Sequence, residues 1–198
     1  MSDPFVHLHV ASGYSLRHGA SSPAALVERA AEHGMDTLAL TDRDGAYGVV
    51  KFAKACARAG VRPVFGVDLA VAPLSAVRTR ASQTRASPAR GGAFLEQEEP
   101  APGGGPGAWG LPRITLLARD GRGWAALCRL ISATHLSGER GTPVSSLDLV
   151  AEHAGGAAQD GALAVLLGPG SELGRSLAAR RPDLARGHLD RWRDVLGA

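Results

Sequence analysis

Three histidines near the start of the chain are the side chains best suited to chemistry. His7 and His9 lie two residues apart in the apolar stretch 5–10, and His18 follows in the next loop. Side chains alternate along an extended segment, so His7 and His9 share one face. Imidazole nitrogens grouped in this way suit a divalent metal or a phosphate group. A short H-x-H pattern also occurs by chance on solvated strand faces, so both interpretations stay open.

Two aspartates occupy matching places in later apolar stretches. Asp42 ends the stretch 36–42, and Asp68 lies within the stretch 64–71. Reactive groups in parallel sheets gather just beyond the carboxyl ends of the strands. We therefore expect the two carboxylates and the histidines of the first stretch to reach one pocket, where both side-chain types are ordinary metal ligands.

The order of the apolar segments predicts an α/β fold. Strands are expected at 5–10, 36–42, 64–71, 114–118 and 162–167. Helices are expected at 23–33, 47–59, 123–136, 145–152, 171–180 and 182–196. Ser22 followed by Pro23 is typical of a helix start, and Gly34 and Gly60 are typical of helix ends. Because strands and helices alternate, we expect about five parallel strands.

Composition narrows the class of protein. The chain has 198 residues and a net charge of +3, which permits contact with nucleic acid without arguing for it. Cys56 and Cys128 fall on apolar faces of expected helices, so we expect buried, reduced thiols. No apolar run is long enough to cross a membrane, and residues 1–20 lack a signal-peptide pattern. These features predict a cytoplasmic protein without a membrane partner.

Residues 73–112 interrupt the strand and helix pattern. The stretch is rich in Ala, Ser, Gly, Pro and Arg and then in Glu, and residues 100–107 cannot hold regular structure. We predict a long disordered insertion whose end Trp109 docks onto the body of the protein. A basic and then acidic solvated loop is the simplest interpretation, but four arginines could instead touch an anionic partner. They are Arg78, Arg80, Arg85 and Arg90.

Four stretches together resemble the PHP (polymerase and histidinol phosphatase) domain of bacterial C-family DNA polymerases. The family comprises the DNA polymerase III alpha subunits and the error-prone DNA polymerases. The first stretch is FVHLHVASGYSLRHGAS at 5–21, and the longest is 26–71, which contains LALTDRDG. The other two are RITLLARDGRGWAALCRLISATHLSG at 113–138 and, more loosely, LAVLLGPGSELG at 163–174.

The resemblance implies a fold and an activity. It implies an incomplete, distorted (β/α)₇ barrel, divided here into a first part at 1–72, the insertion at 73–112 and a second part at 113–198. In active members a cleft of histidines and carboxylates binds up to three divalent metals, and metal-bound hydroxide hydrolyses phosphoester bonds. The parent proteins would be nucleotidyltransferases of DNA replication and repair. The remainder of such a polymerase is then the expected partner, with DNA and accessory proteins as further partners.

The family's ligand pattern is only partly present. His7, His9, His18, Asp42 and Asp68 form the candidate metal set, with zinc, manganese or magnesium as the weakly bound metal if there is one. At three further positions where the family usually has a metal ligand, this chain has Ala11, Arg43 and Arg113. Losing several imidazoles removes most of the affinity of a multinuclear site. An arginine in such a site could pair with Asp42 or Asp68.

Three functions follow from these observations. The leading hypothesis is a mostly structural PHP domain with a degenerate metal site and no polymerase activity of its own. The second is a metal-dependent phosphoesterase or 3′–5′ exonuclease that works with the reduced ligand set. The third is a nucleic-acid-binding module that uses the arginines of the insertion, which would give a steep salt dependence of DNA binding.

Overall fold

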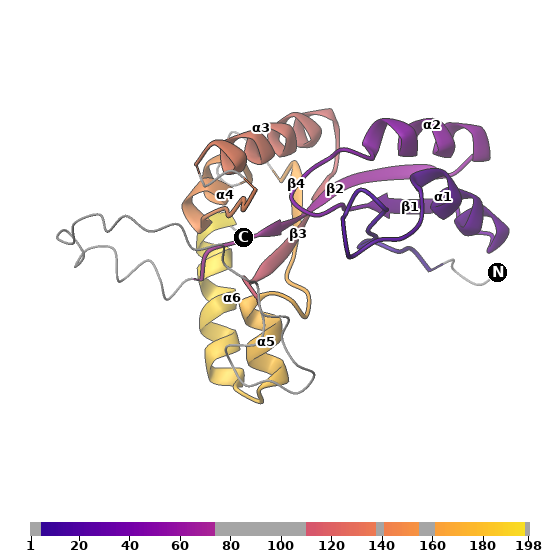
Figure 1. Ribbon diagram of the computed structural model, residues 1–198. Coiled ribbons are helices and arrows are strands. Elements are labelled where there is room, and N and C mark those ends of the chain that lie inside the picture. Colours follow the sequence, from indigo (N-terminus) through magenta and orange to yellow (C-terminus); the bar gives the residue numbers. More distant parts are fainter. Residues whose placement is uncertain (1–4, 74–109, 138–140, 155–160, 197–198) are drawn as a thin grey trace, which may run out of the picture.

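The computed structural model describes residues 5–73, 110–137, 141–154 and 161–196. Ten elements follow one another in these ranges (Figure 1). The helices are α1 (Pro23–Glu32), α2 (Val49–Ala59), α3 (Gly121–Ser137), α4 (Leu147–Ala154), α5 (Glu172–Ala178) and α6 (Pro182–Leu196). The strands are β1 (Thr37–Leu40), β2 (Arg62–Ala70), β3 (Arg113–Ala118) and β4 (Leu163–Leu166). Most of the expected insertion, with Trp109, falls outside the described residues.

The strands form one sheet in the order β1-β2-β3-β4. β1 and β2 are parallel, but β2 with β3 and β3 with β4 are antiparallel. The expectation of about five parallel strands is therefore wrong for the second half of the chain. β3 starts with Arg113 opposite Ala70, so the chain re-enters the sheet at the end where β2 leaves it. Two helices, α3 and α4, lie between β3 and β4, as the sequence predicts from the stretches 123–136 and 145–152.

The expected first strand at 5–10 is not a regular strand. It runs beside β1, where the His7 and Val10 carbonyls accept hydrogen bonds from the Ala39 and Thr41 amides at 3.0 and 2.8 Å. The Val10 amide, however, donates to the Thr41 hydroxyl at 2.9 Å instead of to a backbone carbonyl. A side chain thus interrupts the backbone ladder, and only an isolated bridge at His7 is left.

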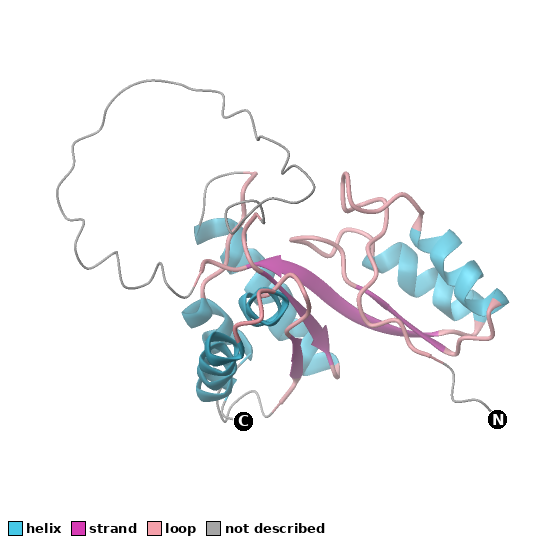
Figure 2. Ribbon diagram, turned by 90° about the horizontal axis from the view of Figure 1, so that it is seen from below, coloured by secondary structure: helices cyan, strands magenta, loops and turns pink. Residues whose placement is uncertain are grey.

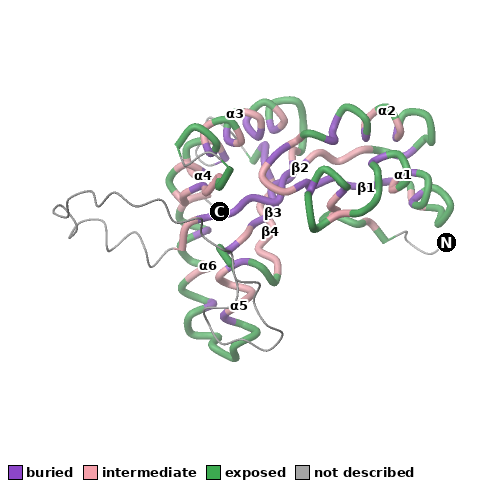
Figure 3. Tube along the Cα trace, in the orientation of Figure 1, coloured by how far each residue is buried: buried purple, intermediate pink, exposed green. Residues whose placement is uncertain are grey.

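Two apolar clusters lie at opposite ends of the long strand β2. α1 and α2 cover β1 and the start of β2, while α3, α4 and α6 pack around β3, β4 and the end of β2. Figure 2 shows β2 running from one group of helices to the other, and Figure 3 shows buried residues concentrated along the strands. Phe65 connects the clusters, because its ring lies 6.3 Å from that of Phe52 and 5.5 Å from that of Trp124.

Local signals set several helix ends as predicted. The Ser22 hydroxyl accepts a hydrogen bond from the Ala25 amide, and Pro23 begins α1. Gly60 ends α2 in the left-handed conformation, with φ of 69°. Cys56 is buried, whereas Cys128 is only partly buried, and both are free thiols. Within the described ranges, no helix has the length and apolar character needed to cross a bilayer.

Candidate functional site

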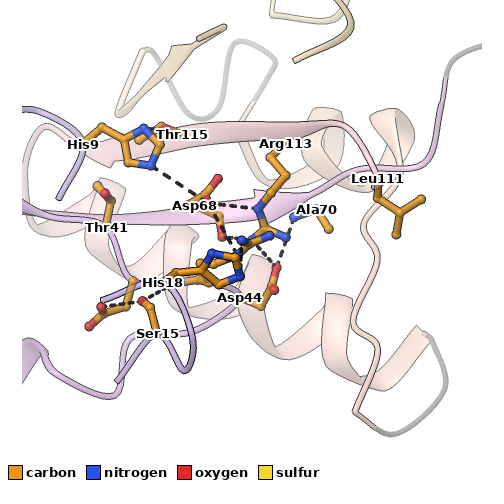
Figure 4. A network of polar contacts seen from close by, with 12 residues as sticks. His9, Ser15, His18, Thr41, Asp44, Asp68, Ala70, Leu111, Arg113 and Thr115 are labelled. Atoms are coloured by element: carbon orange, nitrogen blue, oxygen red, sulfur yellow. Dashed lines mark hydrogen bonds and ion pairs between the residues drawn. The ribbon is translucent and has the colours of Figure 1, made fainter. Parts of the chain in front are cut away.

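Polar side chains from four segments meet where β1 ends and β3 begins (Figure 4). The segment 9–18 and the turn 41–45 approach from one side. Asp68 comes from β2, and Arg113 and Thr115 come from β3. β1 and β2 are parallel neighbours, which explains why Arg43, just after β1, forms a bridge with Asp68. Because β3 is antiparallel, it contributes residues from its amino end to the same place.

Asp42 is buried and anchors the loop that follows the first histidines. Its Oδ1 accepts hydrogen bonds from the Ser12 amide at 2.7 Å and the Ser15 hydroxyl at 2.7 Å. The Ser12 hydroxyl also contacts both carboxylate oxygens, at 3.0 and 2.9 Å. A Cβ atom on Gly48, which precedes α2, would lie 2.7 Å from Oδ2, so the carboxylate sits close to the amino end of that helix. Asp42 therefore holds backbone and hydroxyl donors rather than facing the histidines.

Arg113 is the centre of the cluster. Its Nε donates to Asp68 Oδ2 at 2.9 Å, and its Nη2 donates to Asp44 Oδ1 at 2.9 Å. Nη2 also donates to the Asp68 carbonyl at 2.7 Å. The Arg113 side chain is 15% exposed and that of Asp68 is 9% exposed, so this is a largely buried, charge-assisted contact. One guanidinium thus fastens β3 to β2 and to the turn after β1.

Arg43 and His18 form a second contact beside this cluster. Arg43 Nη1 donates to His18 Nε2 at 2.5 Å, which requires a neutral imidazole with its proton on Nδ1. Partial burial, followed by the positive charges of Arg43 and Arg113, lowers the pKa of His18 below its ordinary value. Arg43 also pairs with Asp68, but its Nε lies 3.9 Å from Oδ2. The sequence suggested that an arginine could pair with Asp68, and both arginines do so: Arg43 loosely and Arg113 closely. Among the described residues, neither arginine pairs with Asp42.

The two histidines of the H-x-H pattern lie apart from one another. The His9 ring borders the cluster, with Nε2 4.0 Å from Asp68 Oδ2 and Nδ1 3.5 Å from the Thr115 hydroxyl. The His7 ring packs edge-on against Phe5 and borders a different hollow of about 340 Å³. Residues of α1 and β1 also line that hollow, among them Leu26, Ala30 and Leu38. Ala11, at an expected ligand position, has a methyl side chain that cannot bind a metal ion.

Sequence reasoning missed two members of the cluster. Asp44 was not among the candidate site residues, yet its carboxylate accepts hydrogen bonds from Arg113 and from the Ala70 amide. Its φ of 54° is unusual for a residue other than glycine. This backbone conformation marks Asp44 as a special position, but it is visible only in the structure. His135 on α3 was likewise not among the candidate site residues. Its Nε2 donates to the Asp44 carbonyl at 2.6 Å, which joins α3 to the same turn.

The residues present do not fit the metal centre that the resemblance implies. Asp42 is occupied by serine hydroxyls, Asp68 by a guanidinium, and the Nε2 atom of His18 by Arg43. In the described ranges, no three His, Cys, Asp or Glu side chains are grouped so that they could hold a metal ion. What the arrangement does chemically is bind arginine side chains to carboxylates, which joins β2, β3 and the turn after β1. The hydrogen bond from His135 to the Asp44 carbonyl adds α3.

The fold and this site define a mixed α/β domain with histidines, aspartates and arginines at its strand ends. The chain matches the description "PHP domain" over residues 7–198, and it belongs to that family. It is 39% identical to the error-prone DNA polymerase of Mycobacterium tuberculosis over 77% of this chain and 12% of that protein. It is 30% identical to the DNA polymerase III subunit alpha of Saccharopolyspora erythraea over 99% of this chain and 16% of that protein. The chain therefore spans less than a fifth of the length of these relatives.

Solved structures resemble the chain more distantly. An amidohydrolase from Chromobacterium violaceum with bound sulfate and no metal shares 23% sequence identity with it. The similarity covers 67% of this chain and 34% of that one, with a TM-score of 0.40. The assignment to the family rests on the sequence matches.

Proposed function

We propose that this chain is the PHP domain of a longer C-family DNA polymerase and that it stabilises that polymerase rather than hydrolysing phosphoesters. The similarity to error-prone polymerases over most of this chain but a small part of those proteins supports the first half of the proposal. The remainder of the polymerase is then the main partner. DNA and accessory proteins are further partners of the whole assembly, and the place of action is the cytoplasm.

One observation carries the structural role: Arg113 stands between the carboxylates of Asp68 and Asp44. A guanidinium with hydrogen bonds of 2.9 Å to both carboxylates supplies positive charge where a metal cation would otherwise balance them. A metal ion that approached Asp68 would have to displace this charge or be repelled by it. The cleft is therefore held together by the protein's own cations.

Metal titration tests the proposal. The chain, purified without chelator, should contain no stoichiometric metal, and zinc, manganese or magnesium should leave its melting temperature unchanged. The double variant Ala11→His/Arg43→His adds two imidazoles and removes one cation. If the site has decayed from a metal centre, we expect zinc to raise the melting temperature of this variant by several degrees.

A metal-dependent phosphoesterase or 3′–5′ exonuclease is the second candidate. The observation in its favour is that the His9 and His18 rings are exposed on either side of Asp68. It would use His7, His9, His18, Asp42 and Asp68 as its ligands. Stoichiometric metal in the wild-type chain, with a melting temperature that rises on titration and does not rise in His9→Ala, would favour this candidate and contradict the first.

The domain organisation is part of the same proposal. Residues 1–72 and 113–198 form two parts of one PHP domain, and 73–112 is an insertion between them. The antiparallel pairing of Ala70 with Arg113 supports this division, as does the hydrogen bond of 2.9 Å from the Val71 amide to the Pro112 carbonyl. The two ends of the insertion thus lie side by side in one ladder, which is where a fold tolerates extra chain.

A further inference from the structure

The outward face of α2 carries three positive charges. Lys51, Lys54 and Arg58 lie on one side of this helix, because residues three, four and seven positions apart are neighbours on a helical surface. All three residues are exposed, and the buried residues of α2 lie on its opposite side. α2 itself contains no acidic residue. We call these three cations the basic face of α2.

The neighbouring helix does not neutralise the basic face. α1 packs against α2 and has two acidic residues, Glu28 and Glu32. Glu32 pairs with Arg29 of its own helix at 2.8 Å. In the part of the chain that the structure describes, no carboxylate forms an ion pair with a cation of the basic face. The three charges are therefore available to an anionic partner.

Two tyrosines border the start of the basic face. Lys51 Nζ lies 5.5 Å from the centre of the Tyr14 ring. A Cβ atom on Gly48 would lie 3.1 Å from Tyr14 Cδ2, so this ring also lies against the residue that precedes α2. Tyr47 is the next residue towards the amino terminus, and 66% of its surface is exposed. Flat aromatic surfaces thus lie beside the cations, where a planar group can stack on them.

A hollow of about 280 Å³ adjoins the same place. Tyr14, Pro23 and Lys51 are among the residues that line it. Its volume is close to the lower end of the range for small-molecule pockets, which is about 300 Å³. A flat ring that enters this hollow meets the Tyr14 side chain and the lysine ammonium together.

We propose that the basic face of α2, together with Tyr14 and Tyr47, binds single-stranded nucleic acid. Phosphates of the strand contact the three cations, and bases stack on the tyrosines. From Lys51 to Arg58 the helix rises about 10 Å at about 1.5 Å per residue, and a stacked strand advances about 3.4 Å per nucleotide. The basic face therefore spans about three phosphates. An acidic protein segment would satisfy the charges too, but lysine is depleted at protein–protein interfaces.

This inference goes beyond the proposed function, which gives nucleic acid no place on this chain. It uses none of the candidate metal ligands and none of the insertion arginines. The two ideas therefore fail separately. Stoichiometric metal would contradict the proposed function whatever α2 binds, and a basic face that binds no strand would leave the structural role of the domain intact.

The experiment is a fluorescence anisotropy titration of the full chain with a short, labelled, single-stranded thymidine oligonucleotide at several salt concentrations. The wild type should bind in the micromolar to submillimolar range at low salt. Each phosphate contact to a single strand contributes about 0.7 to the slope of log affinity against log salt. Lys51→Gln/Lys54→Gln should therefore reduce the slope by about 1.4 and weaken binding at least tenfold at low salt.

A second double variant is the matched control for charge. Arg186→Gln/Arg193→Gln also removes two positive charges, from exposed positions on α6. It should keep the affinity and the salt slope of the wild type. No binding by the wild type, or equal weakening in the two double variants, would overturn the proposal, because binding would then follow only the net charge of the protein.

Variants of Tyr47 separate stacking from charge. Tyr47→Ala should weaken binding about tenfold, whereas Tyr47→Phe keeps the ring and should bind as the wild type does. Tyr47 is exposed, so both variants should fold. Two results would exclude a role for the bases and so contradict the proposal. One is equal affinity for an abasic strand of the same length, and the other is equal displacement of the strand by polyglutamate of the same charge.

Lysine footprinting locates the bound strand without any substitution. Lys51 and Lys54 are the only lysines of the chain, so their acetylation, measured by mass spectrometry, reports on this face alone. A saturating strand should slow the acetylation of both residues several-fold. Unchanged acetylation under saturating strand would show that the strand binds elsewhere on the chain, and the proposal would then be wrong.

Discussion

At the scale of residues, one arginine joins groups that are far apart in sequence. Arg113 contacts Asp68 and Asp44, which precede it by 45 and 69 residues. All three side chains are at most about a quarter exposed, so the contact differs from a surface salt bridge, which contributes little. Removing one member of a buried ion pair leaves the charge of the other member uncompensated, which strongly lowers the free energy of unfolding.

Arg113→Met should therefore lower the free energy of unfolding by about 3 kcal/mol, because buried Asp68 then keeps only its looser ion pair with Arg43 at 3.9 Å. Urea denaturation measures the loss. The double variant Arg113→Met/Asp68→Leu removes both charges and should recover a large part of it. A loss below about 1 kcal/mol in the single variant would show that the cluster contributes no more than an exposed pair.

His18 gives the cluster a defined dependence on pH. Its pKa in the folded protein is lowered, first by burial and then by Arg43 and Arg113, from an ordinary value of 6.5. As the pH falls below about 6.5, the unfolded chain binds a proton that the folded chain accepts only at lower pH. The stability should therefore fall with pH in this window.

The prediction is checked by comparing wild type with His18→Gln in urea unfolding between pH 7 and pH 5, a range set by the ordinary histidine pKa of about 6.5. The wild type should lose more stability than the variant as the pH falls. In a nuclear magnetic resonance titration, Arg43→Gln should move the His18 pKa back towards its ordinary value. Parallel stability curves for wild type and His18→Gln would contradict the electrostatic account.

At the scale of elements, α3 packs unusually close to the backbone before β4. A Cβ atom on Gly123 would lie 2.1 Å from the Ala162 carbonyl oxygen, which is part of the backbone and cannot rotate away. The Arg119 amide also donates to that carbonyl at 2.9 Å, which fixes its position. Glycine is therefore needed at this point of α3 for a reason of tertiary packing.

Gly123→Ala should destabilise the protein by about 2 kcal/mol, because the helix must move away from the sheet to make room. Gly187→Ala is the matched control: Gly187 lies within α6, and a Cβ there would meet nothing within 4 Å. Since alanine favours a helix more than glycine does, this control should gain about 0.5–1 kcal/mol. Thermal or urea unfolding gives both values, and a change of the same sign in both would contradict the packing argument.

At the scale of the whole molecule, β2 contributes residues to both apolar clusters of the described ranges. It pairs with β1 at its start and with β3 at its end, so the first and second parts of the chain become one sheet. The proposed insertion leaves and re-enters where β2 and β3 are already paired. A much shorter segment could therefore connect β2 to β3.

Replacing residues 74–109 by a four-residue Gly-Ser linker should leave the fold intact. Shortening a loop about ninefold reduces the entropy cost of closing it, so we expect the unfolding free energy to rise by about 2 kcal/mol. Urea denaturation and circular dichroism provide the check. Loss of the folded signal would contradict the domain division. Loss of DNA binding with an intact fold would instead favour the nucleic-acid role of the arginines in that segment.

The sequence by itself determined the helices, the positions of most strands and the family. Ser22, Pro23 and Gly60 act through contacts within a few residues, so a local pattern is enough to recognise them. The same holds for the approximate ranges of β2 and β3, where the buried residues follow one another in the chain and are mostly apolar. The arginines at expected ligand positions were also visible before the fold was known.

Only the tertiary structure decided the strand directions and the partners of the candidate site residues. The direction of β3 and β4 depends on how the intervening chain crosses the sheet, which local patterns do not record. Likewise, Asp42 follows β1 and Asp68 lies near the end of β2, yet the first carboxylate accepts hydrogen bonds from serine hydroxyls and the second from Arg113. That difference arises because charge pairing acts between groups that folding brings together, across tens of residues of sequence.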